Sequence, residues 1–310
     1  MIFPNSHTLR SRNFGESDLL ENEIVITAEL PSEQRGEIEA WNNIDADKII
    51  LVKPEAKDEI SALINRSNRV NINLRSTESI RSLLESAESL LIDITSLRHS
   101  IWAPLVKFCY EQNLNYRVLY VEPAKYQHHP SPSSDTFFDL TTKFEGMLPL
   151  PGFAKLDRDV QTGNDIFVTM LGFEGSRPRR LLTELEPEPK VIPIIGVSAF
   201  KIEYPTYTIA CNRGMLTEYN IFSEIRHARA SCPFEIYETL SQLRADFPDS
   251  YMYIAPVGTK PHALGAVIYH LANANSTELL YDHPIGKENR TKGKSQVHVY
   301  SMNKFPQHND

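Results

Sequence analysis

The sequence predicts an α/β protein made of two tandem Rossmann-like units with parallel sheets, related by internal duplication. A buried strand at 90–94 leads through a polar turn into a helix over 100–112 and a further strand at 116–123. The same order recurs later in the chain, over 251–255, 258–262, a helix to about 274, and 278–284. Upstream, the spacing from Thr27 to Ile49 equals the spacing from Thr169 to Val191. Similar spacing also occurs in unrelated α/β proteins, but two matches in one chain favour duplication.

The first unit, residues 1–127, is expected to alternate strands and helices. Its apolar runs are nearly continuous, which is typical of central parallel strands, and they lie at 25–29, 48–52, 70–74, 90–94 and 116–123. Apolar residues at helical spacing predict helices over 57–66, with Ile60, Leu63 and Ile64, and from Thr77, with Ile80, Leu83 and Leu84.

Residues 128–160 are expected to form a linker and connector, because the Pro- and Ser-rich segment 128–135 is the clearest break in the chain. The second unit then covers 161–310, with an insertion near 197–230 that the pattern does not assign. Within this unit Ser231 is expected to cap a helix over 233–247. A last strand over 296–302 is expected to pair at a sheet edge.

Length and composition set limits on the class of protein. A chain of 310 residues can bury a core without disulfides or metal. Its three cysteines form no C-x-x-C pair, and Cys109 falls in an apolar helix, which fits reduced thiols and a cytoplasmic location. The sequence has no apolar run long enough to cross a bilayer, so we expect no membrane insertion. A net charge of −8 argues against generic DNA binding, which needs many Lys and Arg.

Several motifs with known chemistry are absent. There is no H-E-x-x-H, no G-x-S-x-G and no G-x-G-x-x-G after the first strand, and Gly293-Lys294-Ser295 lacks the spacing of a phosphate-binding P-loop. His128 and His129 have no ligand partners nearby, and His283 follows Asp282 alone. We therefore expect no metal site and no cofactor, and the sequence identifies no catalytic residue.

The two turns that open the repeated helices are the candidate ligand-binding sites. Each combines hydroxyl, cation and imidazole groups at a helix start, where unpaired N–H groups attract anions. The second turn provides Gly258, Thr259, Lys260 and His262, and the first provides Thr95, Ser96, Arg98 and His99. Two basic clusters, Arg177 to Arg180 and Lys287 to Lys294, are placed so that they could reach the same edge of the second sheet. The alternative is that the hydroxyls only cap helices, the imidazoles pack in the core and the clusters are solvated loops.

The run Gly258-Thr259-Lys260-Pro261-His262 before a helix of small residues resembles the signature of CARF domains, the CRISPR-associated Rossmann-like sensors of cyclic oligonucleotides. Two such units in one chain resemble SAVED domains, which bind cyclic nucleotides in antiphage defence. The first turn departs from this pattern, because it has no Gly and has Leu97 in place of Lys. The resemblance implies two CARF-like units and phosphate binding at the turns.

Three functions follow as expectations. The first is a nucleotide-binding sensor or scaffold subunit in a bacterial antiphage defence assembly. Its ligand would be a cyclic or linear nucleotide, and a separate effector protein would be its partner, because the sequence contains no recognisable effector. The second is a metal-independent ring nuclease, with Lys260 and Arg98 stabilising charge and His262 or His99 moving protons. The third is a protein-interaction scaffold with no small ligand.

Overall fold

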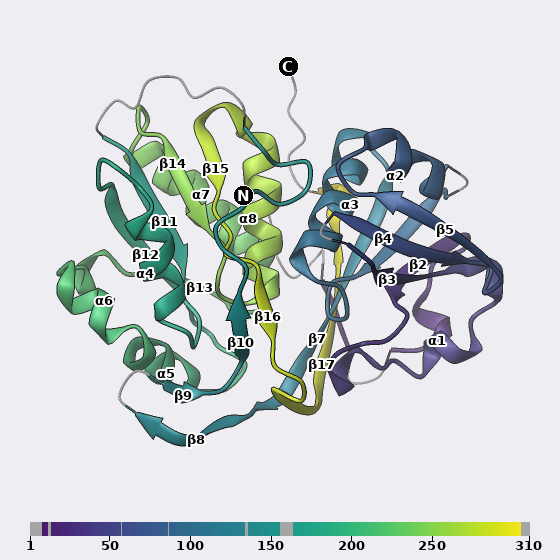
Figure 1. Cartoon of the computed structure of the whole chain (residues 1–310), viewed down its shortest axis with the longest axis horizontal. Helices are drawn as coiled ribbons and strands as arrows, with labels where there is room; N and C mark the ends of the chain where they lie inside the picture. The colour runs from purple at the N-terminus through teal and green to yellow at the C-terminus, as the bar shows by residue number, and fades with distance from the viewer. Residues whose placement is uncertain are drawn as a thin grey trace.

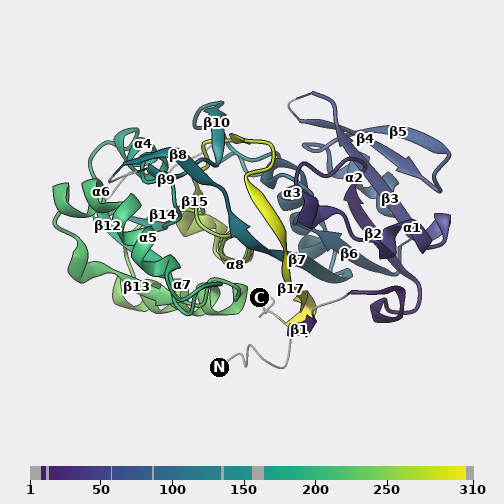
Figure 2. The same cartoon turned by 90° about the horizontal axis from the view of Figure 1, so that it is seen from below.

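The computed structural model of the chain describes residues 8–11, 14–56, 58–85, 87–133, 136–155 and 164–304. The protein is α/β, with a large mixed sheet, a smaller parallel sheet and helices packed on both (Figure 1). Two small two-stranded sheets complete the fold, and Figure 2 shows the molecule from a second side.

The large sheet has eight strands in the order β1-β17-β7-β6-β2-β3-β4-β5. In that order, the strands are Thr8–Ser11, Thr291–Ser301, Asn115–Tyr126, Ser89–Asp93, Glu23–Ala28, Ile49–Pro54, Glu59–Ile64 and Asn68–Asn73. The neighbours from β7 to β3 are parallel, and the remaining pairs are antiparallel. Its helices are α1 (Ala40–Asn43), α2 (Thr77–Leu84) and α3 (His99–Glu111).

The smaller sheet has five strands, all parallel, in the order β13-β12-β11-β14-β15. In that order, the strands are Arg226–Ala228, Lys190–Gly196, Ile166–Met170, Met252–Ala255 and Thr277–Leu279. The helices of this half are α4 (Ser176–Thr183), α5 (Tyr204–Cys211), α6 (Arg213–Glu218), α7 (Pro233–Asp246) and α8 (Lys260–Ala272).

Four strands of each sheet follow the same order. In the large sheet the parallel run is β7-β6-β2-β3, and in the smaller sheet it is β15-β14-β11-β12. The pairing registers agree as well, because Thr27 lies opposite Leu51 and Thr169 lies opposite Pro193, with the same separation along the chain. The strand of Leu90 and the strand after Tyr251 therefore hold the same place in their sheets.

The predicted helix over 57–66 is wrong. Residues Glu59–Ile64 form β4, which pairs with β3 and β5 in an antiparallel hairpin. The pair Asn65 and Arg66 makes the tight turn, both with φ of 52°. The expectation of five parallel strands in the first unit is therefore also wrong, because the strand near 70–74 runs antiparallel to its neighbour.

The end of the chain belongs to the first sheet rather than to the second unit. Strand β17 lies between β1 and β7, so the predicted strand over 296–302 is internal to a sheet and not at its edge. The predicted second unit, residues 161–310, therefore wrongly includes residues 291–301, which form β17 of the first sheet. A long antiparallel pair of β7 with β17 is more stable there than an isolated edge, because its apolar residues Val297 and Val299 are buried.

The segment predicted as a linker is ordered where the structure describes it. Residues His128–Ser133 (β8) pair with Thr136–Phe138 (β9), and Thr141–Phe144 (β10) pair with Pro284–Gly286 (β16). The remaining parts of the predicted linker and connector, at 134–135 and 156–160, lie outside the described residues. The predicted insertion near 197–230 contains α5, α6 and the edge strand β13. Helix α7 is confirmed, although Cys232 and not Ser231 is its N-cap.

The two halves share one apolar core. Helices α3 and α8 pack against each other, and α8 also packs closely on α7. One continuous cluster of buried side chains includes Trp102 of α3 together with Leu264 of α8 and Ile254 of β14. Because α3 and α8 begin directly after β6 and β14, this packing brings the two repeated turns to one place in the molecule.

Candidate functional site

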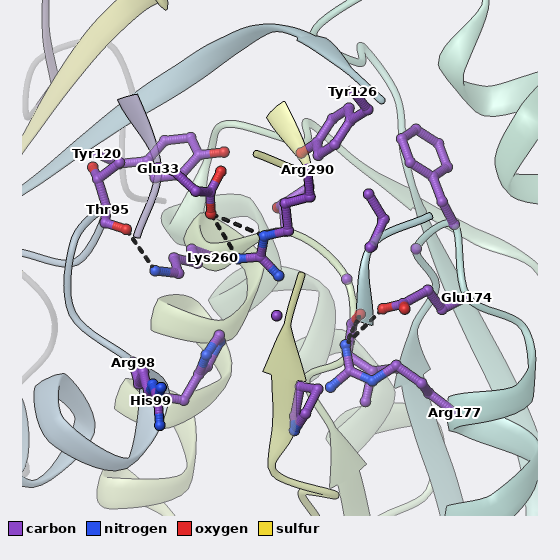
Figure 3. A pocket seen from close by; sticks show the side chains of 18 of the residues that line it. Glu33, Thr95, Arg98, His99, Tyr120, Tyr126, Glu174, Arg177, Lys260 and Arg290 are labelled. Carbon is purple, nitrogen blue, oxygen red and sulfur yellow. Dashed lines mark hydrogen bonds and ion pairs between the residues drawn. The ribbon is translucent and has the colours of Figure 1, made fainter. Parts of the chain in front are cut away.

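A cavity of about 210 Å³ lies where the carboxyl ends of the parallel strands of the two sheets meet (Figure 3). Both repeated turns line it, the first with residues from Thr95 to Ser100 and the second with residues from Val257 to Lys260. In parallel sheets this is the edge at which ligands bind, because helix N-termini converge there. All of the predicted ligand-binding residues line the cavity, with the exception of His262.

In the first turn, the hydroxyl groups of Thr95 and Ser96 hold the backbone in place. The Thr95 Oγ1 accepts a hydrogen bond of 2.8 Å from the Val121 N–H, and the Ser96 Oγ accepts one of 3.0 Å from the Ala28 N–H. The fully buried carboxylate of Asp93 accepts from the Thr95 N–H at 2.9 Å. The turn is therefore fastened to β2 and β7, and its hydroxyls are already engaged.

Arg98 and His99 are the residues of the first turn that remain available to a ligand. Arg98 is exposed and stands at the N-cap of α3, where its side chain makes no cap hydrogen bond. The His99 Nδ1 lies 2.8 Å from the Tyr281 hydroxyl, and its Nε2 has no partner among the described residues. Burial, followed by the charge of Lys260, lowers the pKa of His99 well below its usual value, so the ring is neutral at pH 7.

In the second turn, Gly258 and Thr259 shape the start of α8. A Cβ at Gly258 would come within 3.1 Å of the Met170 carbonyl oxygen and 3.2 Å of that of Leu171, so only glycine fits without a shift. The Thr259 hydroxyl donates to the Ala230 carbonyl at 2.7 Å and accepts from the His262 N–H at 3.3 Å. This is an N-cap arrangement, which fits the alternative in which the Thr259 hydroxyl only caps the helix.

Lys260 reaches across from the second turn to the first. Its Nζ donates to the carbonyl oxygens of Ile94, Thr95 and Leu97 at 2.6, 2.8 and 2.8 Å. A protonated lysine has three donors, so all of them are used by these carbonyls. Burial, followed by the charge of Arg35, lowers the pKa of Lys260 to about 7. Lys260 therefore joins the two turns, and its charge acts on the cavity from the wall.

His262 does not line the cavity. It is 1 % exposed, and its Nε2 contacts the Arg229 carbonyl at 2.9 Å. Burial lowers the pKa of His262 to about 4, so the ring is neutral. This position fits the alternative in which the imidazole packs in the core.

Two buried arginines that sequence reasoning did not connect, one from each half, line the cavity. Arg35 donates from Nε to Glu33 at 2.9 Å and stacks over the Tyr120 ring at 5.4 Å. Arg177 donates to Asp282 at 2.7 Å and stacks over the Tyr281 ring at 5.6 Å. Asp282 is completely buried. Each guanidinium is thus held by a carboxylate on one side and a tyrosine face on the other.

Glu33 connects residues near the end of the chain to Arg35 in the lining of the cavity. Arg290 donates to Glu33 at 2.7 Å and the Thr291 hydroxyl donates to it at 2.5 Å, in addition to Arg35. Burial alone would raise the pKa of Glu33, but the charges of Arg35 and Arg290 hold it well below its usual range. Of the two basic clusters, Arg177 and Arg290 reach the cavity, whereas Arg179, Arg180, Lys287, Lys292 and Lys294 do not line it.

An aromatic cluster forms one wall of the cavity. Tyr126, Phe173 and Tyr204 contact each other with ring centroids 5.2 to 5.8 Å apart and planes at 61° to 87°. Phe200 also lines this side and stacks on Tyr120 at 5.9 Å. These residues come from separate strands and loops, so neither their spacing nor their composition marks them in the sequence.

The charge of the lining is positive on balance. Five Lys or Arg side chains and three Glu side chains line the cavity, namely Arg35, Arg98, Arg177, Lys260 and Arg290 against Glu33, Glu145 and Glu174. Together with the start of α3 and the aromatic wall, this composition suits an anion that carries an apolar ring. In the part of the chain that the structure describes, no group of three or more His, Cys, Asp or Glu side chains is placed to hold a metal ion.

Comparisons with protein families and with curated proteins give no match for this sequence. No protein-family model matches the chain, and no curated protein matches it. Within the described ranges, none of the helices has both the length and the apolar character that a membrane span requires.

Proposed function

We propose that this protein binds a phosphate-bearing nucleotide in the cavity between its two sheets. The observation that carries the proposal is the meeting of both repeated turns at one cavity that is positive and partly aromatic. A free cation at a helix start suits phosphate, and aromatic rings suit a nucleobase. The resemblance to CARF and SAVED domains supports a sensor or scaffold role in a bacterial defence assembly, in which a separate effector protein responds to the ligand.

We also propose that the two halves arose by duplication, because residues of the cavity correspond between them. The registers of β2 with β3 and of β11 with β12 relate these strands by the same offset along the chain, which takes Thr27 to Thr169. The same offset takes Arg35 to Arg177. The pairing of Ile92 with Val118 and of Ile254 with Leu279 likewise makes Tyr120 equivalent to Tyr281. Each half thus supplies an Arg stacked on a Tyr at the same structural position.

The phosphate is expected at the start of α3. Among the described residues, no ion pair or hydrogen bond engages the Arg98 side chain, and it stands beside the unpartnered Nε2 of His99. The other cations of the lining already have partners, since Arg35, Arg177 and Arg290 pair with carboxylates. Arg98 is therefore the cation that can turn to an incoming anion at the lowest cost.

The test is isothermal titration calorimetry with a panel of linear nucleoside mono- and diphosphates and cyclic dinucleotides. We expect Arg98→Glu to weaken binding of the best ligand by tenfold or more, because hydrogen bonds to charged groups contribute roughly 1.5–3 kcal/mol. Arg81→Glu is the matched control, since Arg81 lies on α2 and does not line the cavity. Equal affinity in the two variants would reject this phosphate position. Failure of every nucleotide to bind the wild type would favour the scaffold function.

His99 favours a second candidate function, metal-independent cleavage of a nucleotide. Its neutral ring lines the cavity, its Nδ1 is held by Tyr281 and its buried Nε2 has no partner among the described residues, so a small rotation of the ring would let Nε2 act as a general base. Incubating the protein with cyclic and linear oligonucleotides with and without EDTA, followed by chromatography, tests this. Cleavage that survives EDTA and is lost in His99→Ala supports it. Cleavage that requires Mg²⁺ would contradict it.

A further inference from the structure

The duplicated halves contribute unequal walls to their shared cavity. At the offset that takes Thr27 to Thr169, Phe173 and Glu174 correspond to Pro31 and Ser32. The first half therefore has no aromatic ring at the place of Phe173. Phe200 and Tyr204 have no counterpart either, because they lie in the segment after β12, whereas β3 continues directly into the hairpin with β4.

The starts of α3 and α8 also differ in the polar groups that they leave without a partner. These groups lie on the side of the cavity away from the aromatic cluster (Figure 3). At the start of α3, Arg98 and His99 line the cavity, and among the described residues the Arg98 side chain and the buried His99 Nε2 have no partner. At the start of α8 the Lys260 amine is bound to three carbonyls and the imidazole of His262 is turned into the core. One end of the cavity thus suits an anion and the other suits an aromatic ring, although the scaffold around them repeats.

The volume of the cavity favours a ligand with one base over a ligand with two. Its volume of about 210 Å³ lies below the roughly 300–1,000 Å³ of sites for drug-sized ligands. Two nucleobases and two phosphates would need more room. On the side of the first half, Ser32 lines the cavity and no aromatic ring stands at the position equivalent to Phe173.

We infer that the cavity takes a single nucleoside mono- or diphosphate, with its phosphate at Arg98 and His99 and its base against the aromatic cup of Tyr126, Phe173 and Tyr204. This inference rests on the proposed function and specifies the ligand class for the same cavity. It distinguishes one linear nucleotide from a twofold-symmetric cyclic ligand, which the repeated scaffold alone would favour.

The experiment compares three kinds of probe by calorimetry: the monophosphates AMP, GMP, CMP and UMP, ribose 5-phosphate, and cyclic di-AMP with cyclic di-GMP. We expect at least one monophosphate to bind more tightly than ribose 5-phosphate and than both cyclic dinucleotides. Tighter binding of a cyclic dinucleotide than of any monophosphate would overturn the inference while leaving nucleotide binding intact. Binding of none of the probes would count against the proposed function itself.

The aromatic cup is tested separately with Phe173→Leu, which keeps an apolar side chain but removes the ring. We expect about a tenfold loss of affinity for the best monophosphate, since stacking of one base contributes roughly 1–3 kcal/mol, and no change for ribose 5-phosphate. Phe222→Leu is the matched control, because Phe222 is 46 % exposed and does not line the cavity. Equal loss for both probes would show a general disturbance and reject the placement of the base, as would no loss for either.

Discussion

At the scale of the residue, Lys260 shows that a local motif can predict where a turn lies without predicting what its side chains bind. The sequence places a hydroxyl, a cation and a glycine at a helix start, and that pattern predicts a phosphate contact. In the structure the cation instead binds carbonyls of the first turn, some 163 to 166 positions earlier in the chain. No local pattern reports contacts of that range, so the position of the turn was predictable and the partner of its lysine was not.

We expect Lys260 to make stability depend on pH. Its pKa of about 7 in the folded protein lies below its ordinary value of 10.5, so between these values the unfolded chain binds a proton that the folded chain has released. Stability therefore rises with pH across this window, and the gain is lost again as the pH falls to the folded pKa near 7. The gain is at most about 1.4 kcal/mol per pH unit.

The measurement is urea unfolding of the wild type and of Lys260→Met at several pH values from 7 to 9. All other titrating groups are common to the two proteins, so the difference in their free energies of unfolding isolates Lys260. We expect the free energy of unfolding of the wild type to increase relative to that of Lys260→Met as the pH rises. A difference that stays constant would mean that the three carbonyls keep the amine protonated throughout.

At the scale of the element, periodicity predicted the helices better than the hairpins. Helix α2 follows its pattern, with Ile80, Leu83 and Leu84 buried. Residues 59–64 have the same apolar spacing but form β4, because Asn65 and Arg66 adopt the positive φ of a tight hairpin turn. Such turns are usually marked by Asn-Gly, and without the Gly the sequence signal is weak. Pairing with β3 and β5 then decides the conformation.

The packing of α7 on α8 depends on a glycine in the middle of α8. A Cβ at Gly265 would lie 2.2 Å from the Pro233 carbonyl oxygen and 2.9 Å from the Ile236 Cβ. Gly265→Ala therefore forces the two helices apart, even though alanine favours helix formation. We expect the free energy of unfolding to fall by about 1–3 kcal/mol.

Gly214→Ala provides the comparison, because Gly214 is also helical and a Cβ there meets nothing within 4 Å. We expect that substitution to be neutral or to stabilise by about 0.5–1 kcal/mol. Chemical denaturation of both variants measures the contrast. Similar values for the two would indicate that α7 and α8 separate at little cost.

At the scale of the whole molecule, the two halves are joined by several independent connections. The Tyr300 hydroxyl of β17 donates to the Ser231 carbonyl of the second half at 2.7 Å, and Tyr300 is fully buried. Arg290 binds Glu33 across the chain. The repeated order of elements was visible in the sequence as matching spacings. The return of β17 to the first sheet was not, since its alternation of residues fits an edge strand in either sheet.

We therefore expect the protein to unfold in one cooperative transition, although its sheets are separate. The apolar cluster that includes Trp102, Leu264 and Ile254 spans both halves, so neither half can unfold without exposing core side chains of the other. Each buried side chain of this size contributes roughly 1.5–3 kcal/mol through the hydrophobic effect. A half-unfolded intermediate would lose many of these contributions while gaining the entropy of only part of the chain.

The measurement follows urea unfolding with two probes. Both tryptophans lie in the first half, Trp41 away from the shared core and Trp102 within it, so fluorescence reports on that half and on its packing against α8, whereas far-ultraviolet circular dichroism reports on helices of both halves. Coincident transitions indicate one cooperative unit. A fluorescence transition displaced from the dichroism transition would show that the halves unfold separately. In that case the cavity, which both halves line, would be lost with the first half that unfolds, and a ligand bound there would shift that first transition to higher urea concentration.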